Sequence, residues 1–480
     1  MTHLLIIAAY VSLHLRDVPS MRPVAIELGF WQSVGATLGG FALLAVWTDL
    51  LVRLRLRRID RRGRGIDVFR AMRSSARSRT LATVWLAVSV VVFGWLESVR
   101  SVVGDPVLLD ELLAMLPLLV VWACSWWSVE PVERRLREAT LLRRLDEGLP
   151  VGPGPSRLVF VLDAMRHQVL LILVPLMFAA SWIETLEKFS RGDGRIALWL
   201  QDDLIRLGAT LAGLLVVFAF APMLLRLIWD TTPLGDGAIR ARLRNLGERH
   251  GVGLGKLLIW RTHGTVLNAA VTGLFPGVRA VLLSDALVDQ LDERQIEAVA
   301  AHEVGHIRRR HIPWLAGAAI VLLTGVSVVV SMLVFAVWGP IAMDDWRGAA
   351  AIALGLLAGM AVFGVVSRRF EWQADAFAAQ HMSGLSTARG ASDPEIHIRE
   401  DAADAMVGAL ERVAVGNGIA PERRSWRHGS IRRRQRNLEK IVGLPAVALP
   451  IDRQVRIVKI AIVLCGVITV LLLAAHGSMA

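Results

Sequence analysis

Two histidines and a glutamate within five residues, His302-Glu303-Val304-Gly305-His306, have types and spacing suited to metal chemistry. Residues four apart share one face of an α-helix, so both imidazoles can face one ion. Zinc held by two imidazoles and one further ligand keeps a position for water and lowers its pKa to about 7. Glu303 would take the proton of that water, which then attacks an amide carbonyl. A match this short also arises by chance, so its context must support it.

A third ligand is needed, and the segment from Ser367 to Ala378 offers one. Glu371 and Asp375 are four residues apart and share a face if this segment is helical. Glu371 would complete the ligand set, and Asp375 would hold the second nitrogen of a ligand histidine. The alternative is a solvated helix face on which the two acids pair with neighbouring arginines.

The residues before the metal motif predict the helix that must carry it. Asp292 is suited to the N-cap, and Gln295 three residues later forms a variant of the capping box. Apolar residues then recur at helical spacing, so we expect a helix from Glu293 to about Arg310, ending near Pro313.

Short strands are predicted upstream at Lys256 to Trp260 and Ala280 to Leu283. A strand beside the metal helix can pair with an extended peptide through backbone hydrogen bonds. His311 follows three arginines and is expected at the membrane interface. His250 has no partner at a useful spacing.

The string HEVGH followed by SRRFEWQADAFA resembles the M48 family of integral-membrane zinc metallopeptidases, which includes the Ste24 and HtpX types. That family has H-E-x-x-H and, after two membrane spans, E-x-x-x-D. The resemblance implies that His302, His306 and Glu371 bind a single zinc ion per subunit. It also implies that Glu303 is the general base and Asp375 a supporting residue.

A segment from Ser425 to Ile431 resembles the family's S-x-H-P element. There a histidine helps to stabilise the oxyanion, and an arginine six residues later points into the site. His428 and Arg434 fill these positions, but Gly429 stands where the family has proline. Another segment resembles the N-A element at the family's substrate-binding edge; its candidate residues are Asn268, Ala269 and Gly273.

The composition favours a membrane protein. The 480 residues are 54% hydrophobic and 20% charged, and the mean hydropathy is +0.51. The net charge of +12 is spread unevenly, so the lipid bilayer is the expected partner and nucleic acid is not. Cys124 and Cys465 lie in apolar runs and provide no disulfide framework.

Apolar length predicts eight spans, because about 20 residues cross the hydrocarbon core. They are Phe30 to Val52, Thr80 to Val99, Leu112 to Val129, Val169 to Ile183, Leu207 to Trp229, Trp314 to Val337, Ala349 to Val366 and Ile457 to Ala475. Leu4 to Leu15 is shorter. We therefore expect a mostly α fold, a polytopic membrane helical bundle with a zincin-like α+β metallopeptidase domain.

The arginine-rich stretch from Arg53 to Arg79 is expected to be a cytoplasmic loop. Alternation from there places the active site of this multi-pass cell-membrane protein on the cytoplasmic side. Five regions follow: an N-terminal membrane region (1–229), a zincin core (230–313), a two-span hairpin (314–366), the second half of the catalytic domain (367–454) and a final span (455–480).

The sequence thus predicts a zinc endopeptidase that cleaves membrane-associated or membrane-delivered proteins. A protease of the site-2 type also uses H-E-x-x-H, but there the helix is buried in lipid and the third ligand is an aspartate. The charged flanks of His302 to His306 disfavour that alternative. A catalytically silent scaffold or chaperone that retains the zinc site is the other alternative, and the intact Glu303 and Glu371 disfavour it.

Overall fold

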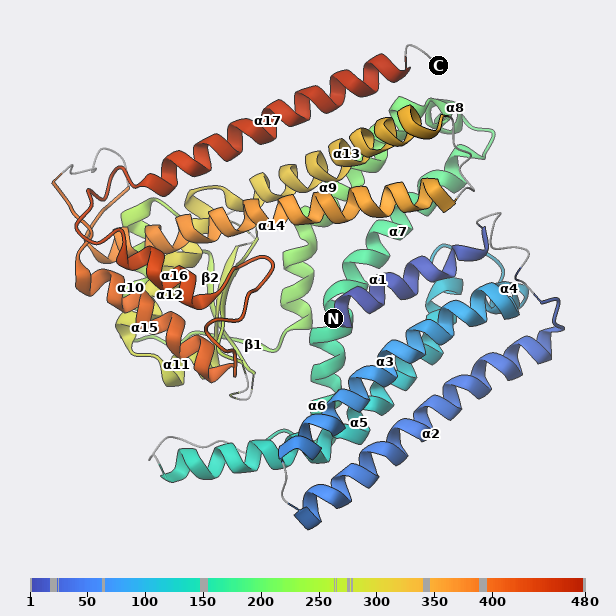
Figure 1. Cartoon of the computed structure of the whole chain (residues 1–480), viewed down its shortest axis with the longest axis horizontal. Helices are drawn as coiled ribbons and strands as arrows, with labels where there is room; N and C mark the ends of the chain where they lie inside the picture. The colour runs from blue at the N-terminus through green and yellow to red at the C-terminus, as the bar shows by residue number, and fades with distance from the viewer. Residues whose placement is uncertain are drawn as a thin grey trace. The chain divides into compact units, whose positions relative to one another are not determined.

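The computed structural model describes residues 2–17, 24, 26–62, 65–146, 154–262, 264, 266–273, 277, 279–339, 346–387 and 395–477. The chain forms two compact units, Met1–Trp229 and Asp230–Ala480, each described here by itself. The division falls at the first of the predicted region boundaries. The five-region scheme stays a prediction, and three of its boundaries fall inside continuous helices, α13 (His311–Trp338), α14 (Trp346–Met382) and α17 (Pro450–Gly477) (Figure 1).

The described part of the N-terminal unit is helical. Its elements are α1 (Thr2–Leu13), η1 (Leu15–Asp17), α2 (Phe30–Arg62), α3 (Gly65–Phe93), α4 (Trp95–Val103), α5 (Leu109–Asp146), α6 (Arg157–Met165), a π-helical turn η3 (Arg166–Leu170), α7 (Leu171–Ser190), α8 (Arg195–Gln201) and α9 (Asp203–Ile228). Helices α2, α3 and α5 pack against one another around fully buried side chains such as Leu86 and Trp122.

Two predictions for this unit are corrected in part. A candidate span is present where Thr80 to Val99 is expected, but it ends at Phe93, because Gly94 adopts φ 66° between α3 and α4, a conformation that favours glycine. The arginine-rich loop expected from Arg53 to Arg79 is instead helical over its described residues, as the ends of α2 and α3. Arginine is a good helix former and carries the helices past their apolar parts.

Six helices among the described residues are long and apolar enough to cross a membrane: Phe30–Arg61, Arg70–Phe93, Leu109–Glu138, Arg157–Ser190, His311–Trp338 and Pro450–Leu472. Each overlaps a predicted span, which makes this a multi-pass membrane protein. The other two predicted spans lie within α9 and α14, where several side chains are outside the described part, and they stay predictions. The segment near Leu4 forms a shorter apolar helix, Leu4–Leu13.

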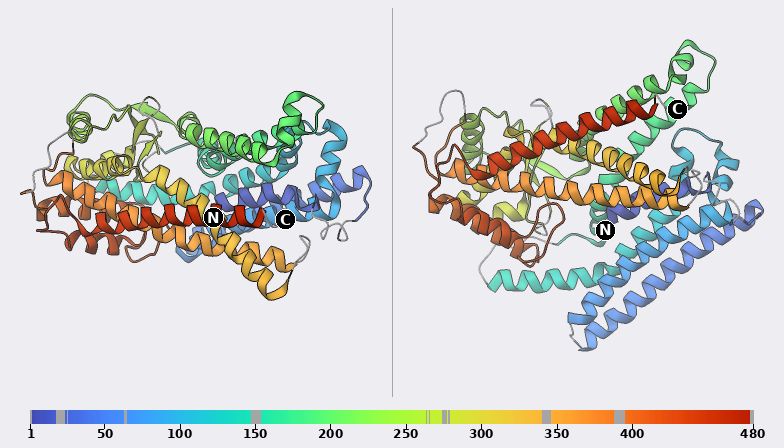
Figure 2. Two further views of the ribbon diagram at one scale, coloured as in Figure 1. Left: turned by 90° about the horizontal axis from the view of Figure 1, so that it is seen from above. Right: turned by 45° about the horizontal axis from the view of Figure 1, so that its top comes forward.

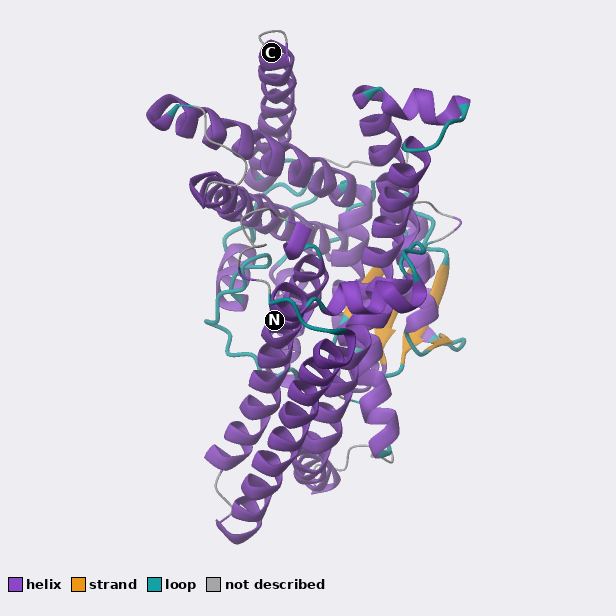
Figure 3. Cartoon of the chain, turned by 90° about the vertical axis from the view of Figure 1, so that its right-hand side faces the viewer, coloured by secondary structure: helices purple, strands orange, loops and turns teal. Residues whose placement is uncertain are grey.

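The C-terminal unit contains a small sheet with helices around it (Figure 3). Its strands are β1 (Thr231–Pro233), β2 (Lys256–Trp260), β3 (Ala269–Thr272) and β4 (Ala280–Ser284), in the order β1-β2-β4-β3. β2 and β4 pair in parallel, and β1 and β3 pair antiparallel to them at the two edges. The two predicted strands are confirmed as β2 and β4.

The helices of this unit are α10 (Ala238–His250), α11 (Asp285–Gln290), α12 (Glu293–Arg308), α13 (His311–Trp338), α14 (Trp346–Met382), α15 (Glu400–Gly416), α16 (Ile431–Glu439) and α17 (Pro450–Gly477). The long helices α13, α14 and α17 pack against one another (Figures 1 and 2). The mostly helical fold with a small α+β part is the one that the sequence predicts.

The predicted metal helix is α12. Its N-cap is Asp292, whose carboxylate accepts a hydrogen bond from the backbone N–H of Gln295 at 2.8 Å. The helix does not continue to Pro313 as expected. Arg310 adopts φ 56°, in the left-handed region, and α13 begins at His311. Proline is accommodated in the first turn of the new helix, where an N–H has no helical partner.

Gly305 lets α12 approach α14 closely. A Cβ atom at this position would lie 3.1 Å from Cβ and Cδ1 of Phe377. That separation is shorter than ordinary van der Waals contact, so a larger side chain must push the two helices apart. The close packing matters because α12 carries His302 and His306, whereas α14 carries Glu371.

Gly305→Leu is therefore expected to lower the free energy of unfolding by about 1–3 kcal/mol relative to a matched control, as overpacking does. The control is Gly317→Leu in α13, where a Cβ meets nothing within 4 Å. Each change replaces a helical glycine by leucine, so the gain in helix propensity is the same. The difference in stability between the two variants therefore measures the contact with Phe377. Thermal unfolding of the purified proteins measures it, and equal stability of the two variants would contradict the prediction.

Candidate metal centre

Three side chains from two helices converge in the C-terminal unit. His302 and His306 lie one turn apart on α12, and Glu371 comes from α14, which packs along α12. The Nε2 atoms of the two imidazoles are 3.2 Å apart. Each also lies 3.7 Å from a carboxylate oxygen of Glu371.

These separations fit a tetrahedral ion. Zinc lies about 2.0–2.2 Å from nitrogen and oxygen ligands, which places tetrahedral ligands about 3.3–3.5 Å from one another. Two imidazoles and a carboxylate are also a donor set that catalytic zinc uses, with a fourth position left for water. Among the described residues, this is the group whose His, Cys, Asp and Glu ligand atoms meet within 4.8 Å.

The protonation of two of the ligands, His306 and Glu371, suits metal binding. Burial lowers the pKa of His306 well below its usual value, and the neighbouring charge of His302 acts in the same direction. A neutral imidazole with a free Nε2 lone pair results. Burial opposes the charge on Glu371, but a hydrogen bond from His428 and the charge of Arg434 hold the pKa of that carboxyl well below its usual range.

Asp375 holds the other side of His302. Its Oδ1 lies 2.9 Å from Nδ1 of His302, so the Nε2 atom of that ring is left to face Glu371 and His306. Burial opposes charge on His302, but Asp375 outweighs it and raises the pKa of this imidazole. The carboxylate is almost fully buried, at 2% exposure.

Arg434, on α16, pairs with Asp375 in two places. Its Nε donates to Oδ2 at 2.8 Å and its Nη2 to Oδ1 at 2.6 Å, a bidentate arrangement. Nη1 lies 3.6 Å from Oε2 of Glu371. The arginine therefore faces the site, and its guanidinium is engaged mainly with Asp375.

Glu303 follows His302 on α12 and is partly buried, and the charges of His302 and Glu371 act on its carboxyl. Burial raises the pKa of its carboxyl, and the charge on Glu371 adds to this effect. The charge of His302 and the backbone N–H of Val271 act in the opposite direction. Val271 belongs to β3, so the contact links the acid to the edge strand of the sheet. A carboxyl with a raised pKa is a better proton acceptor at neutral pH than an ordinary glutamate.

His428 enters the site from a short loop. Its Nδ1 lies 3.0 Å from Oε1 of Glu371, while 51% of its side chain is exposed. Ser425 and Gly429 close the loop with two backbone hydrogen bonds, at 2.9 and 3.0 Å. Gly429 adopts φ 77°, which proline cannot, so the departure from the family's proline matches the local backbone. Trp426 ties the loop to α14 by donating to the carbonyl of Met360.

The predicted substrate residues lie at the edge of the sheet. Ala269 begins β3, Asn268 precedes it, and Gly273 follows it with φ 90°. β3 contacts α12 and is bonded within the sheet to β4 alone. The backbone groups on its outer side are thus placed where an extended peptide could pair with them.

Sequence reasoning missed two histidines. His311 is fully buried within the protein and its Nδ1 lies 2.9 Å from Nδ1 of His306, a contact that was not predicted, while its expected place at the membrane interface stays a prediction. Residues five apart do not share a helix face; the left-handed Arg310 brings these two together. His250, expected to have no partner, contacts His381 at 2.9 Å, although they are far apart in the sequence.

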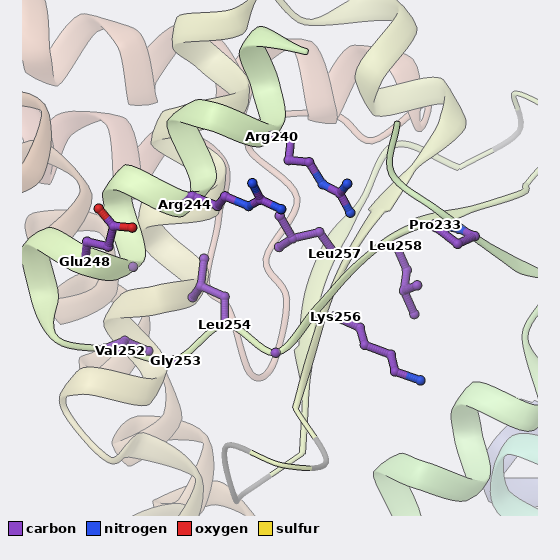
Figure 4. A pocket seen from close by; sticks show the side chains of 12 residues that line it. Pro233, Arg240, Arg244, Glu248, Val252, Gly253, Leu254, Lys256, Leu257 and Leu258 are labelled. Carbon is purple, nitrogen blue, oxygen red and sulfur yellow. The ribbon is translucent and has the colours of Figure 1, made fainter. Parts of the chain in front are cut away.

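Two hollows lie apart from the three ligand atoms. One, of about 570 Å³, lies between α10 and β2 (Figure 4). Arg240 and Arg244 extend from α10 toward Leu257, while Lys256 points the other way. The other, of about 250 Å³, lies between α14, α16 and α17 and has Asp375 in its wall. Neither contains the donor set of a metal ion, so the chemistry is assigned to the convergence of His302, His306 and Glu371.

Arg434→Met is expected to destabilise the protein by about 3–5 kcal/mol, because it leaves the buried Asp375 without its cation. A matched control is Arg432→Met on the same helix, where the arginine forms an exposed pair with Glu422 at 3.6 Å. Exposed pairs contribute about 0–1 kcal/mol. Unfolding of the purified proteins distinguishes the two, and equal losses would contradict the burial argument.

A comparison with known protein families also points to the segment that contains these residues. Residues 237–392 match the model of Peptidase family M48. The CAAX prenyl protease 1 homolog of Arabidopsis thaliana is 29% identical over 190 residues, which cover 35% of this chain and 42% of the relative. A protease HtpX homolog of Desulforapulum autotrophicum is 33% identical over 123 residues, or 23% of this chain and 38% of the relative.

A longer match, 28% identical over 272 residues, is to the probable CAAX prenyl protease 1 of Schizosaccharomyces pombe, and it covers 51% of each protein. The chain thus spans about half, or less, of the length of these relatives. The crystal structure of S. mikatae Ste24p aligns with 86% of this chain and 99% of its own, at 15% identity and a TM-score of 0.39. The matched segment contains HEVGH, Glu371 and Asp375, so the similarity to peptidase family M48, with relatives of both the CAAX prenyl protease and HtpX kinds, covers the residues of the candidate metal centre.

Proposed function

We propose that this protein is a membrane-embedded, zinc-dependent endopeptidase. The observation that carries the proposal is the convergence of His302, His306 and Glu371 at distances suited to zinc, with Glu303 beside them. When bound, zinc would polarise the scissile carbonyl and lower the pKa of a water molecule. The names of the relatives, proteases of the CAAX prenyl and HtpX kinds, support hydrolysis of a peptide bond.

Glu303 is proposed as the general base. It takes a proton from the attacking water and delivers it to the amine that leaves. Its raised pKa suits this exchange, because a carboxyl that is too acidic holds no proton to deliver. Its contact with β3 also places it next to a peptide that lies along that strand.

His428 is proposed to donate a hydrogen bond to the oxyanion of the tetrahedral intermediate. Its half-exposed ring lies next to Glu371 and is accessible from solvent. Arg434 is better suited to positioning than to contact with the oxyanion. Two of its guanidinium nitrogens are engaged by Asp375, which in turn orients His302.

The substrate is proposed to be a membrane-associated or membrane-delivered protein that pairs with β3 near Asn268, Ala269 and Gly273. His311, the first residue of a candidate span, contacts the ligand His306, which sets the site beside an apolar helix. The charge distribution in the sequence favours the cytoplasmic side. Both the substrate class and the sidedness belong to this proposal.

The two alternatives fit the geometry less well. In a site-2 type protease the metal helix lies within lipid, whereas α12 is 16 residues long with a charged N-terminal turn. A silent scaffold that retains zinc has no need of an acid beside the ligand atoms. The hydrogen bond from Val271 of β3 to Glu303 supports a catalytic role for this acid instead.

Glu303→Gln is expected to keep zinc and to lower the rate of peptide cleavage by about 10²–10⁴-fold or more, because the amide accepts no proton. Glu371→Ala is expected to lose zinc as well as activity. Elemental analysis of the purified variants measures their zinc content. Proteomic comparison of membranes that hold wild-type or Glu303→Gln enzyme measures peptide cleavage, because uncleaved substrates accumulate.

The matched control is Glu293→Gln, which lies on the same helix with its side chain half exposed. It should retain zinc and activity. Undiminished cleavage by purified Glu303→Gln enzyme would remove the proposed mechanism, and a wild-type enzyme without zinc would remove the metal centre.

A further inference from the structure

The Nδ1 side of His306, opposite the nitrogen that faces Glu371, contacts a chain of polar side chains. Its Nδ1 lies 2.9 Å from Nδ1 of His311. Nε2 of His311 lies 2.8 Å from Oε1 of Gln373, and Nε2 of Gln373 donates to Oδ1 of Asp452 at 2.6 Å. The chain thus runs from a proposed zinc ligand on α12, through α13 and α14, to α17.

The direction of each hydrogen bond in the chain follows from chemistry. The Nε2 of His306 must offer a lone pair to the metal, so its proton is on Nδ1 and is donated to His311. His311 accepts at Nδ1 and therefore carries its own proton on Nε2. That proton is donated to the amide oxygen of Gln373, whose NH₂ group faces a carboxylate that can only accept. All four groups are satisfied in one set of tautomers.

The ring of His311 has little freedom to move. It is fully buried, and it stacks on Phe370 with the ring planes 11° apart and the centroids 4.6 Å apart. Phe370 precedes the ligand Glu371 on α14. Asp452, at the far end of the chain, lies 3.4 Å from Nη2 of Arg309. Stacking on Phe370 and the ion pair at Asp452 therefore hold His311 in place as the hydrogen-bond acceptor of His306.

The two zinc ligands on α12 thus have different supports. His302 meets the buried carboxylate of Asp375, whereas His306 meets a neutral imidazole. A second carboxylate beside His306 would add negative charge to a site that already contains Glu371, Asp375 and Glu303. Less negative charge around zinc leaves it a stronger Lewis acid.

We propose that His311 is a positioning residue for the metal: it accepts the Nδ1 proton of His306, fixes the orientation of that ligand, and connects the zinc site to α17 through Gln373 and Asp452. This inference rests on the proposed zinc site. It assigns a role to a residue that lies outside the ligand set and outside the predicted catalytic groups.

Two reciprocal variants of the full-length protein test the role. His311→Asn keeps an acceptor oxygen near the position of Nδ1 but removes the ring, whereas His311→Phe keeps a ring against Phe370 but removes the acceptor. Both lose the bond to Gln373. The zinc dissociation constant, measured by competition with a chelator in detergent, should rise by about 10–100-fold for His311→Phe and clearly less for His311→Asn. His397→Phe, at an exposed histidine, is the control.

If His311→Phe binds zinc as tightly as His311→Asn or more tightly, the ring acts through packing and the inference is overturned. Thermal unfolding of the zinc-free proteins gives a second readout. His311→Asn should bind zinc more tightly than His311→Phe even if the zinc-free His311→Asn protein is less stable than the zinc-free His311→Phe protein. A wild-type protein that binds no zinc would instead overturn the proposed function, so the two failures are distinguishable.

Discussion

The pairing of Asp375 with both His302 and Arg434 is the interaction on which the rest of the site depends. A charged carboxylate buried this deeply is costly unless it is paired with opposite charge and hydrogen-bonded, and here it lies 2.9 Å from an imidazole nitrogen on one side and accepts two hydrogen bonds from a guanidinium on the other. Three helices, α12, α14 and α16, are joined through it. The position of the first ligand is therefore set by an ion pair that forms only when residues far apart in the sequence have packed.

The second histidine, His306, is also held by neighbouring polar side chains, but these neighbours carry less charge. His306 is supported through His311 and Gln373, and the stacking of His311 on Phe370 brings this support to the helix of Glu371. Small residues make the arrangement compact, because Gly305 allows α12 to lie against Phe377. The candidate metal ligands, their supporting side chains and the helix packing are thus parts of one largely buried unit.

Local pattern predicted much of this site. Helical spacing placed His302 with His306 and Glu371 with Asp375, the N-cap Asp292 marked the start of α12, and two strands were found from their β-branched and apolar runs. The predictions that failed depended on local backbone geometry or on contacts between residues far apart in the sequence. The left-handed Arg310 turns His311 back toward His306, and Gly94 breaks a helix that hydropathy alone would continue. The segment from Arg53 to Arg79 lies between two apolar runs and is expected to be a loop, but arginine forms helices readily and the flanking helices extend into it.

The join between α12 and α13 has a consequence for the depth at which chemistry takes place. Only Arg309 and Arg310 separate the metal helix from a 28-residue apolar helix that is a candidate span. In the proposed membrane-embedded enzyme, such a short connection would act as a spacer that keeps the ligands at a constant height relative to the lipid surface. Under the proposed function, a peptide bond would then be cut only where the substrate lies extended at that height. Selectivity would arise from how far a cleavage point lies from its own membrane anchor, as well as from the side chains around it.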